Sequence, residues 1–249
     1  MTCHASRVTR NEFMYVKVLY DRESKKGMDS GWGFSCLIDG KILFDTVDTS
    51  MSLVRNMDRM MVDLDAIDGV VISHEHWDHT GGLWEILKRK KGLKVYVCPS
   101  ASETFRKCVE ELGGRLVEVS GPMEVAENIF LTGEIGGAYK DEYIGEQAVV
   151  VKGEKGGSVI TGCAHPGIVK ILEFARDKLG AKRIYMVFGG FHLDGKDREA
   201  INDIISRLKS MGVEKVGPTH CSGEKARRIF VGQYHDKYIP VRAGHVIHL

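Results

Sequence analysis

The segment that carries most of the structural information runs from residue 69 to residue 83 and reads GVVISHEHWDHTGGL. Its first four residues are apolar and predict a buried strand, and the polar cluster lies where that strand ends. His74 and His76 are two positions apart, so in extended backbone their rings point the same way and can share one metal ion. Asp78 and His79 follow at the turn into a helix and face a neighbouring position, which suits a second metal ion.

Three further histidines follow apolar strands, each at a turn that is rich in glycine or contains proline. They are His165 in TGCAHP (161–166), His192 in FGGFH (188–192) and His220 in GPTHC (217–221). Because strand ends that precede helices gather at one edge of an α/β structure, we expect these side chains to meet the first cluster there. Imidazole and carboxylate suit Zn, Fe, Mn or Ni, and ligand type alone does not choose among these metals.

One competing metal-site pattern is excluded by position. His74 and Glu75 begin like the zincin pattern H-E-x-x-H, but the residue four positions after His74 is Asp78. The zincin pattern also lies on a helix, whereas an apolar strand precedes His74. The cluster is therefore not a zincin site.

Short β-branched segments alternate with amphipathic segments, which predicts one domain over residues 14–249. The expected strands are 15–20, 34–38, 41–44, 69–72, 94–97, 115–119, 129–131, 147–152, 158–161, 184–187, 215–216 and 246–248. The expected helices are 51–61, 83–90, 101–112, 168–179, 198–211 and 224–230. The polar, glycine-rich segment 133–145 is expected to be a loop long enough to lie over a site. Residues 1–13 lack the apolar core of a secretory signal and are expected to form a loose extension.

The composition argues against several classes of protein. The 249 residues carry 35 Lys and Arg against 34 Asp and Glu, and 43% are hydrophobic, so neither disorder nor binding of nucleic acid by bulk charge is expected. No apolar run approaches the ~20 residues of a membrane span. The six cysteines are scattered without a C-x-x-C pair, which is typical of reduced thiols. We expect a cytoplasmic protein that acts on a small molecule, with no nucleic-acid or membrane partner.

At this point the sequence resembles a known family. The pattern H-x-H-x-D-H after a strand, followed by Thr-Gly-Gly-Leu at 80–83, resembles the signature of the metallo-β-lactamase superfamily, and Phe-Asp-Thr at 44–46 is similar to its first motif. The segments around His165, His192 and His220 resemble a branch typified by an archaeal dihydropterin-methyl-ribofuranosylaminobenzene phosphate synthase of methanopterin biosynthesis and shared by bacterial metal-dependent hydrolases. The resemblance implies an α/β fold, a four-layer αββα sandwich in which helices flank two mixed β-sheets.

The resemblance also implies roles for individual residues. One metal would be bound by His74, His76 and His165, and the other by Asp78, His79 and His220. Two divalent metal ions are implied, with zinc favoured and Fe, Mn or Ni also compatible. Asp45 would orient a ligand without binding metal itself.

Two departures from the family pattern affect this assignment. The family usually has an Asp that bridges both metals after the strand that here covers 184–187, whereas this chain has FGGFH. The bridging carboxylate is missing, and His192 is expected to be a ligand or a substrate contact. Val47 stands where the family commonly has Gly after the first motif, so that turn is altered. Cys163 and Cys221 are expected to be small buried thiols packed under the site.

The two-metal arrangement predicts hydrolysis of an ester, amide or phosphoester by metal-activated water. Asp78 would orient the water or relay a proton. Lys225, at the start of a basic helix, either contacts a substrate phosphate or lies on a solvated face. Two alternatives stay open: a transferase in which an aromatic amine displaces diphosphate from a pterin-methyl compound, and a weakly catalytic protein with a single metal, including an oxygenase.

Overall fold

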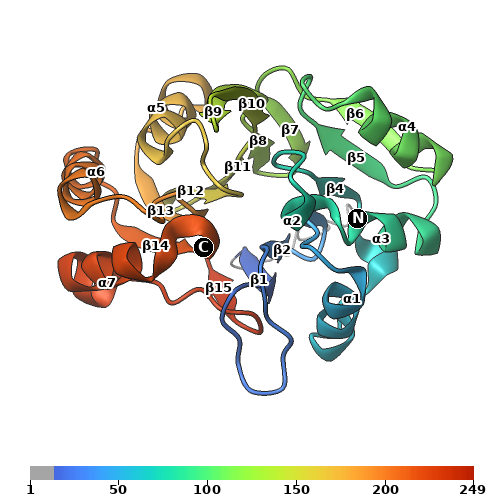
Figure 1. The fold of residues 1–249 in the computed structure, drawn as a ribbon, viewed down its shortest axis with the longest axis horizontal. Coiled ribbons are helices and arrows are strands. Elements are labelled where there is room, and N and C mark those ends of the chain that lie inside the picture. Colours follow the sequence, from blue (N-terminus) through green and yellow to red (C-terminus); the bar gives the residue numbers. More distant parts are fainter. Residues whose placement is uncertain (1–13) are drawn as a thin grey trace, which may run out of the picture.

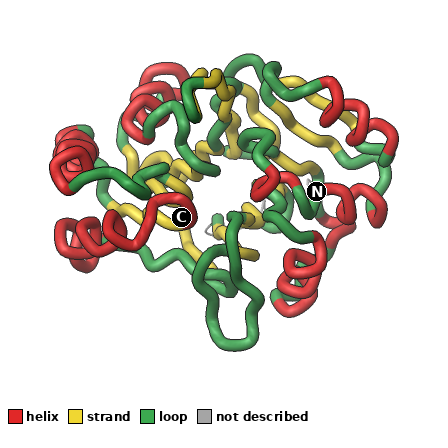
Figure 2. Tube along the Cα trace, in the orientation of Figure 1, coloured by secondary structure: helices red, strands yellow, loops and turns green. Residues whose placement is uncertain are grey.

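The structure, a computed structural model, describes residues 14–249, and the extension expected over residues 1–13 lies outside the described residues. Two large β-sheets lie in the middle of the molecule, and helices cover the outer face of each (Figure 1). Figure 2 shows the same order of layers, with most of the helices on the two flanks. This arrangement is the four-layer αββα sandwich expected from the sequence.

The first sheet is mixed and comes largely from the N-terminal half. Its strands in spatial order are β15 (Val246–His248), β1 (Tyr15–Tyr20), β2 (Ser35–Ile38), β3 (Ile42–Phe44), β4 (Gly69–Val71), β5 (Lys94–Val97) and β6 (Arg115–Glu118). The pairings from β15 to β3 are antiparallel, and those from β3 to β6 are parallel. The parallel pairing brings the carboxyl ends of β3 and β4 side by side.

The second sheet is also mixed. Its strands in spatial order are β14 (Lys215–Thr219), β13 (Ile184–Gly190), β12 (Gly156–Thr161), β11 (Val149–Gly153), β8 (Ile129–Leu131) and β7 (Met123–Ala126). The strands β14, β13 and β12 pair parallel, and the pairings from β12 to β7 are antiparallel. The strand β7 was not predicted, because its sequence MEVA carries only one β-branched residue.

Helices from each half of the chain cover the sheet of that half (Figure 1). The helices on the first sheet are α1 (Ser50–Arg59), α3 (Leu83–Arg89) and α4 (Glu103–Glu111), and those on the second are α5 (Ile168–Leu179), α6 (Arg198–Ser210) and α7 (Gly223–Tyr234). All six were predicted, although α7 extends four residues beyond its expected end. The short helix α2 (Trp77–Thr80) carries two of the candidate metal ligands.

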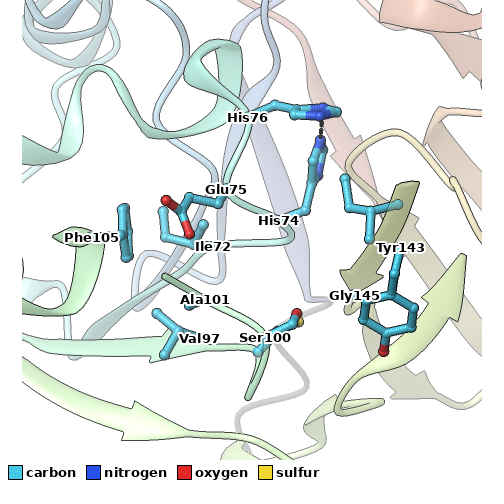
Figure 3. Close-up of a pocket in the computed structure, with 12 residues that line it drawn as sticks. Ile72, His74, Glu75, His76, Val97, Ser100, Ala101, Phe105, Tyr143 and Gly145 are labelled. Carbon is cyan, nitrogen blue, oxygen red and sulfur yellow. Dashed lines mark hydrogen bonds between the residues drawn. The ribbon is translucent and has the colours of Figure 1, made fainter. Parts of the chain in front are cut away.

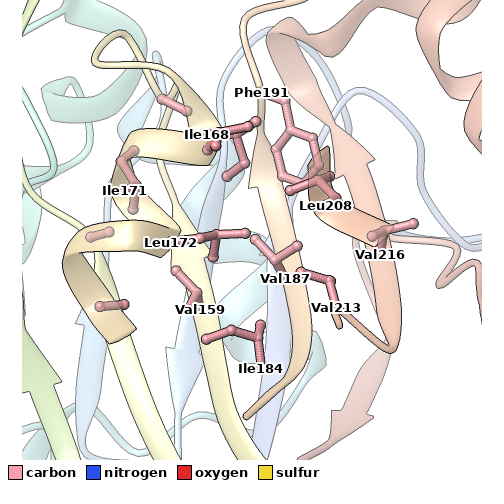
Figure 4. Packing of buried hydrophobic residues seen from close by; sticks show 14 of the residues in the cluster. Val159, Ile168, Ile171, Leu172, Ile184, Val187, Phe191, Leu208, Val213 and Val216 are labelled. Atoms are coloured by element: carbon pink, nitrogen blue, oxygen red, sulfur yellow. The ribbon is translucent and has the colours of Figure 1, made fainter. Parts of the chain in front are cut away.

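Three buried clusters fill the three interfaces between the layers. The cluster between the sheets joins Phe44 of the first sheet to Ile160 and Phe188 of the second. The neighbouring residues Val159 and Val187 point the other way and pack under α5 and α6 (Figure 4). The alternation follows from the two-residue period of a strand that is buried on both faces. Burial of each such side chain stabilises the fold by roughly 1.5–3 kcal/mol.

The segment 133–145 is not a loop, which corrects the sequence prediction. The strands β9 (Ile135–Tyr139) and β10 (Glu142–Glu146) form an antiparallel hairpin that is a sheet of its own. Lys140 and Asp141 connect them with φ values of 50° and 64°, the geometry of a two-residue type I′ turn. The hairpin is rich in glycine and poor in β-branched residues, so the usual strand signal is weak.

Candidate metal centre

The candidate ligands lie at the carboxyl ends of strands from both sheets. Asp45 follows β3, residues 74–79 follow β4, His165 follows β12, His192 follows β13 and His220 follows β14. The φ values of Asp45, His192 and His220 are 54°, 51° and 49°, a conformation that is uncommon outside glycine and that clusters at functional sites. The structure thus brings together the histidines that the sequence predicted to meet.

The first donor group consists of His74, His76 and His165, whose ring nitrogens all lie within 4.8 Å of one another. His74 Nε2 and His76 Nδ1 are 3.0 Å apart, and Figure 3 shows the two rings pointing toward each other. Two nitrogens on one tetrahedral zinc ion are separated by about 3.3 Å when each Zn–N bond is about 2.0–2.1 Å long. The observed spacing therefore fits a shared metal ion.

A chain of hydrogen bonds fixes the tautomer of His74. The Ser73 hydroxyl donates to Asp45 Oδ2 at 2.8 Å and lies 2.9 Å from His74 Nδ1. Because that hydroxyl gives its only hydrogen to Asp45, His74 Nδ1 carries the hydrogen of the second bond. Burial and the neighbouring imidazoles hold the pKa of His74 well below its ordinary value. The ring is neutral, with the Nε2 lone pair directed into the first donor group.

The second donor group consists of Asp78, His79 and His220, whose donor atoms also lie within 4.8 Å of one another. Asp78 Oδ2 is 3.2 Å from His220 Nε2 and 3.6 Å from His79 Nε2. Burial would raise the pKa of the Asp78 carboxyl, but these imidazoles hold it well below its ordinary value. The carboxylate is ionised at neutral pH, which is the form that binds a metal.

Asp45 contacts His79 rather than the space between the donor groups, which fits the orienting role predicted for it. Its Oδ2 lies 2.6 Å from His79 Nδ1, and its Oδ1 accepts the Ser73 N–H at 2.7 Å. Burial raises the pKa of Asp45. Burial would lower the pKa of His79, but the Asp45 carboxyl raises it to about 9. The pair keeps a hydrogen on His79 Nδ1 and directs Nε2 into the second donor group.

His220 shows that the second donor group fits a cation. The side chain is buried, and neither ring nitrogen has a partner with hydrogen-bond geometry. Each buried polar atom left without a hydrogen bond costs about 1–3 kcal/mol, and the nearest polar contact of the ring is the Asp78 carboxylate, 3.2 Å from Nε2. Trp32 packs against the imidazole with the ring centroids 5.2 Å apart. This orphaned imidazole, beside one more imidazole and a carboxylate, fits a divalent metal ion.

Glu146 is a site residue that the sequence analysis missed. Its buried carboxylate accepts the backbone N–H groups of Cys163, Ala164 and His165 at 2.7–2.8 Å and lies 2.8 Å from His165 Nδ1. Burial would raise the pKa of Glu146, but His165 and these amides hold it below its ordinary value. The contact leaves His165 Nε2 to face the first donor group. The sequence offers only a weak signal, an acidic residue three positions before the apolar strand β11.

His192 lies beside the first donor group only. Its ring centroid is 4.6 Å from that of His165, and its donor atoms form a further group with those of His165 and Cys163. Its Nδ1 is buried without a hydrogen-bond partner. Among the described residues His192 forms no such group with members of the second donor group. It therefore does not occupy the bridging position that the missing carboxylate leaves.

Cys163 and Cys221 are buried beside the donor groups, as the sequence predicted. Cys163 Sγ is 3.3 Å from His79 Nε2, and Cys221 Sγ is 3.6 Å from the Cys163 carbonyl oxygen. Burial raises the pKa of the Cys163 thiol well above its ordinary value, so the thiol keeps its proton when no cation is near. A metal ion reverses this, because it deprotonates a thiol that coordinates it.

Tyr139, at the tip of the β9–β10 hairpin, is a second residue that the sequence analysis missed. Its ring centroid lies 4.9 Å from that of His76, 5.4 Å from that of His165 and 5.7 Å from that of His192. The hairpin therefore covers the first donor group. The segment lies over the site as predicted, although its conformation was not.

A cavity of about 280 Å³ opens beside His74 and His76 (Figure 3). Its lining includes the apolar side chains of Val97 and Phe105 and the ring of Tyr143 from β10. The size and lining suit a small ring or another apolar part of a substrate.

A second cavity, of about 390 Å³, opens beside His165 and His192. Its charged lining residues are Lys170, Lys196, Arg207 and Glu173, and Arg207 forms an ion pair with Glu173 at 3.4 Å. Lys225, the predicted phosphate contact, does not line it, because its ammonium donates to the Lys196 carbonyl oxygen at 3.1 Å. The structure does not bring Lys225 to the donor groups, and its role in phosphate binding stays a prediction.

Comparison with known proteins identifies the class of protein that this fold and donor set define. Residues 39–220 match the model of the metallo-beta-lactamase superfamily, so the chain belongs to that superfamily, as its motifs predicted. One relative is the 7,8-dihydropterin-6-methyl-4-(beta-D-ribofuranosyl)-aminobenzene-5'-phosphate synthase of Methanocaldococcus jannaschii. It is 31% identical over 249 positions, which cover 84% of this chain and 85% of the relative.

Solved structures give the same result. Tm1679, described as a metal-dependent hydrolase of the beta-lactamase superfamily, superposes with a TM-score of 0.80 at 30% identity, covering 95% of this chain and 99% of Tm1679. YhfI from Bacillus subtilis, a metallo-beta-lactamase fold protein, superposes with a TM-score of 0.68 at 16% identity, covering 94% and 99% of the two chains. The second likeness bears on the fold alone. Both confirm the predicted fold class.

Two features of the described residues bear on the protein's surroundings. Within residues 14–249 no helix is both long and apolar enough to cross a membrane. The cysteines in that range are free thiols.

Proposed function

We propose that this protein is a metal-dependent hydrolase that uses two divalent metal ions to act on a small, phosphorylated metabolite in the cytoplasm, without a nucleic-acid or membrane partner. Zinc is the favoured metal, with Fe, Mn or Ni compatible. The observation that carries the proposal is the pair of adjacent three-residue donor groups, in which the buried nitrogens of His220 have no partner with hydrogen-bond geometry. The first group would hold one metal and the second group the other.

The residues around the donor groups have distinct proposed roles. Divalent metals bound there would lower the pKa of a water molecule toward about 7 and polarise a substrate oxygen. Asp78 would orient the water or relay a proton, since its carboxylate is ionised at neutral pH. Asp45 and Glu146 hold two of the imidazoles in place. His192 borders the substrate on the side of the first donor group.

The two cavities support a substrate with two different ends. The cavity beside His74 and His76 is partly apolar, whereas the one beside His165 and His192 carries lysine and arginine side chains. Both border the first donor group, so the reacting bond would lie over it. The cationic cavity suits a phosphate and the other a ring.

The second candidate function is a transferase that displaces diphosphate from a pterin-methyl compound. The similarity to the methanopterin synthase over 84% of the chain favours it. The same residues would then bind the diphosphate, and an aromatic amine would attack in place of water. Dependence on the aromatic amine distinguishes the two functions. A transferase forms the coupled product only when the amine is present, whereas a hydrolase converts its substrate without the amine.

The proposal is tested by metal content and by turnover. Elemental analysis of untagged protein for zinc, iron, manganese and nickel should give about two metals per chain. Turnover of a panel of esters and phosphoesters should be lost on chelation and in His220→Ala, but kept in His248→Ala, which removes an exposed histidine. About one metal per chain without turnover would contradict the proposal and favour single-metal chemistry or a binding protein.

A further inference from the structure

The sulfur of Cys163 lies between the two donor groups. Cys163 Sγ belongs to one set of atoms within 4.8 Å of one another with His74 and His79, and to other sets with His165 and with His220. His74 and His165 are members of the first donor group, and His79 and His220 are members of the second. A single atom therefore reaches ligand nitrogens of both groups, which is the position that a bridging ligand requires.

The carboxylates near the donor groups are placed differently. Asp78 forms a set only with other members of the second donor group. Asp45 faces Nδ1 of His79, the nitrogen directed away from the groups. Glu146 accepts backbone N–H groups and the Nδ1 side of His165. Among the described residues, the sulfur of Cys163 therefore lies close to ligands of both donor groups, whereas none of these three carboxylates does.

The backbone around Cys163 fixes the sulfur in that position. The N–H groups of Cys163 and Ala164 both donate to Glu146 Oε1, at 2.8 and 2.7 Å, and Ala164 has a φ of 59°. A Cβ at Gly190 would lie 2.7 Å from Cys221 Sγ and 3.0 Å from Cys163 Cα. A side chain at this β13 residue would thus collide with Cys221 Sγ and crowd the Cys163 backbone, so the strand end at which the resemblance to the family predicts a carboxylate has no room for one at Gly190.

We propose that Cys163 bridges the two metal ions as a thiolate, in place of the carboxylate that this chain lacks. The inference rests on the two-metal site of the proposed function. Binding breaks the Sγ–H bond: the proton goes to solvent, and sulfur lone pairs bond to both metals, without oxidation or reduction. A thiolate ligand selects zinc or iron over manganese.

The test is X-ray absorption at the zinc edge on the full-length protein loaded with zinc. A sulfur neighbour at about 2.3 Å is expected, with about one sulfur per zinc for a bridge and about half that number for a thiolate bound to one zinc. Cys163→Ser should lose this neighbour. Cys221→Ser should keep it, as should Cys108→Ser, which replaces a half-buried thiol on α4. Proton release on loading, measured in weak buffer, gives a readout independent of activity: the unaltered protein should release about one proton more per chain than Cys163→Ser.

Several results would overturn the inference. Two zinc ions per chain with no sulfur neighbour, or with about half a sulfur per zinc, would exclude the bridge and leave the proposed function intact. A sulfur neighbour that survives in Cys163→Ser would assign the ligand to another cysteine. Fewer than two zinc ions per chain would overturn the proposed two-metal function together with the bridge. If Cys163→Ser does not fold, the sulfur count of the unaltered protein and of Cys221→Ser decides the question.

Discussion

The Glu146 carboxylate accepts the Nδ1 hydrogen of His165 at 2.8 Å and, with its two oxygens, the N–H groups of three consecutive residues that end at His165. One side chain from the hairpin strand β10 therefore sets both the backbone after β12 and the tautomer of a candidate ligand. Asp45 has the same relationship to His79 in the second donor group. Each donor group thus has its own buried carboxylate that orients an imidazole.

Replacement of Glu146 should weaken metal binding more than it weakens the fold. In Glu146→Gln the amide NH₂ cannot accept the hydrogen bonds that one carboxylate oxygen accepts now, so His165 loses its fixed orientation. We expect a 10- to 100-fold loss of zinc affinity, the range typical for such outer contacts. Competition with a chromogenic chelator measures it. Glu134→Gln is the matched control, because Glu134 holds Ser100 and Tyr143 instead of a ligand. Equal affinities in the two variants would contradict the role of Glu146.

Removal of metal should lower the stability of the protein, because imidazoles and an ionised carboxylate are gathered in a buried site. A ligand present at 100 times its Kd stabilises the native state by about 2.7 kcal/mol. Chelation should therefore lower the Tm, and zinc should restore it. In His220→Ala the rise in Tm on adding zinc should be smaller, since the second donor group is incomplete. Differential scanning calorimetry with and without chelator measures both effects, and an unchanged Tm after verified metal removal would argue against the site.

Tyr139 should affect substrate binding more than metal binding, because its ring lies against the imidazoles of the first donor group. Tyr139→Ala should raise KM by roughly 2- to 10-fold, the equivalent of about 0.5–1.5 kcal/mol of aromatic contact. Metal content should stay the same. Tyr139→Phe keeps the ring and serves as the control, with KM near that of the unaltered protein. A large loss of kcat in Tyr139→Phe would instead assign a chemical role to the hydroxyl.

The histidine positions were predictable for two reasons. The carboxyl ends of parallel strands meet at one edge of a sheet, and the two-residue period of extended backbone sets the direction of side chains in a motif that follows a strand. Glu146 and Tyr139 were not predictable in this way. They come from a glycine-rich hairpin without strand signals, and their contacts join residues far apart in sequence. The central position of Cys163 likewise depends on the packing of β12 against β13, which no spacing within one segment reveals. The candidate ligands were therefore predictable from local sequence patterns, whereas the residues that orient them were visible only in tertiary contacts.

Gly190 should tolerate no side chain, for reasons of space alone. A Cβ there would meet the Gly162 carbonyl oxygen and the Cys221 sulfur, and backbone atoms cannot easily move aside. Gly190→Ala should destabilise the protein by about 1–3 kcal/mol and reduce metal content. Gly232→Ala is the control, since a Cβ in that part of α7 meets nothing within 4 Å; it should stabilise the helix by about 0.5–1 kcal/mol. Urea unfolding of both variants tests the contrast, and similar stabilities would refute it.

Asp21 should make the metal-free protein lose stability as the pH rises from about 4 to 6. The carboxyl is fully buried, accepts the hydroxyl hydrogen of Thr219, and leaves Oδ1 without a partner. Burial raises its pKa from 3.8 to about 6, against the opposing charges of His220 and Arg227. Between these pH values the folded chain holds a proton that the unfolded chain has released. The free energy of unfolding therefore falls as the pH rises.

The pH dependence of stability that Asp21 causes is large enough to measure. Above pH 6 the ionised Asp21 should cost on the order of 3 kcal/mol relative to pH 3.8. Asp21→Asn keeps an oxygen acceptor for Thr219 and removes the charge, so its advantage over the unaltered protein should grow by that amount between pH 4 and 7. Asp177→Asn is an exposed replacement of the same kind. Its free energy of unfolding should differ from that of the unaltered protein by a constant amount across this pH range. Urea unfolding at several pH values in the presence of chelator gives the three curves. Parallel curves for Asp21→Asn and the unaltered protein would mean that Asp21 titrates as it does in the unfolded chain.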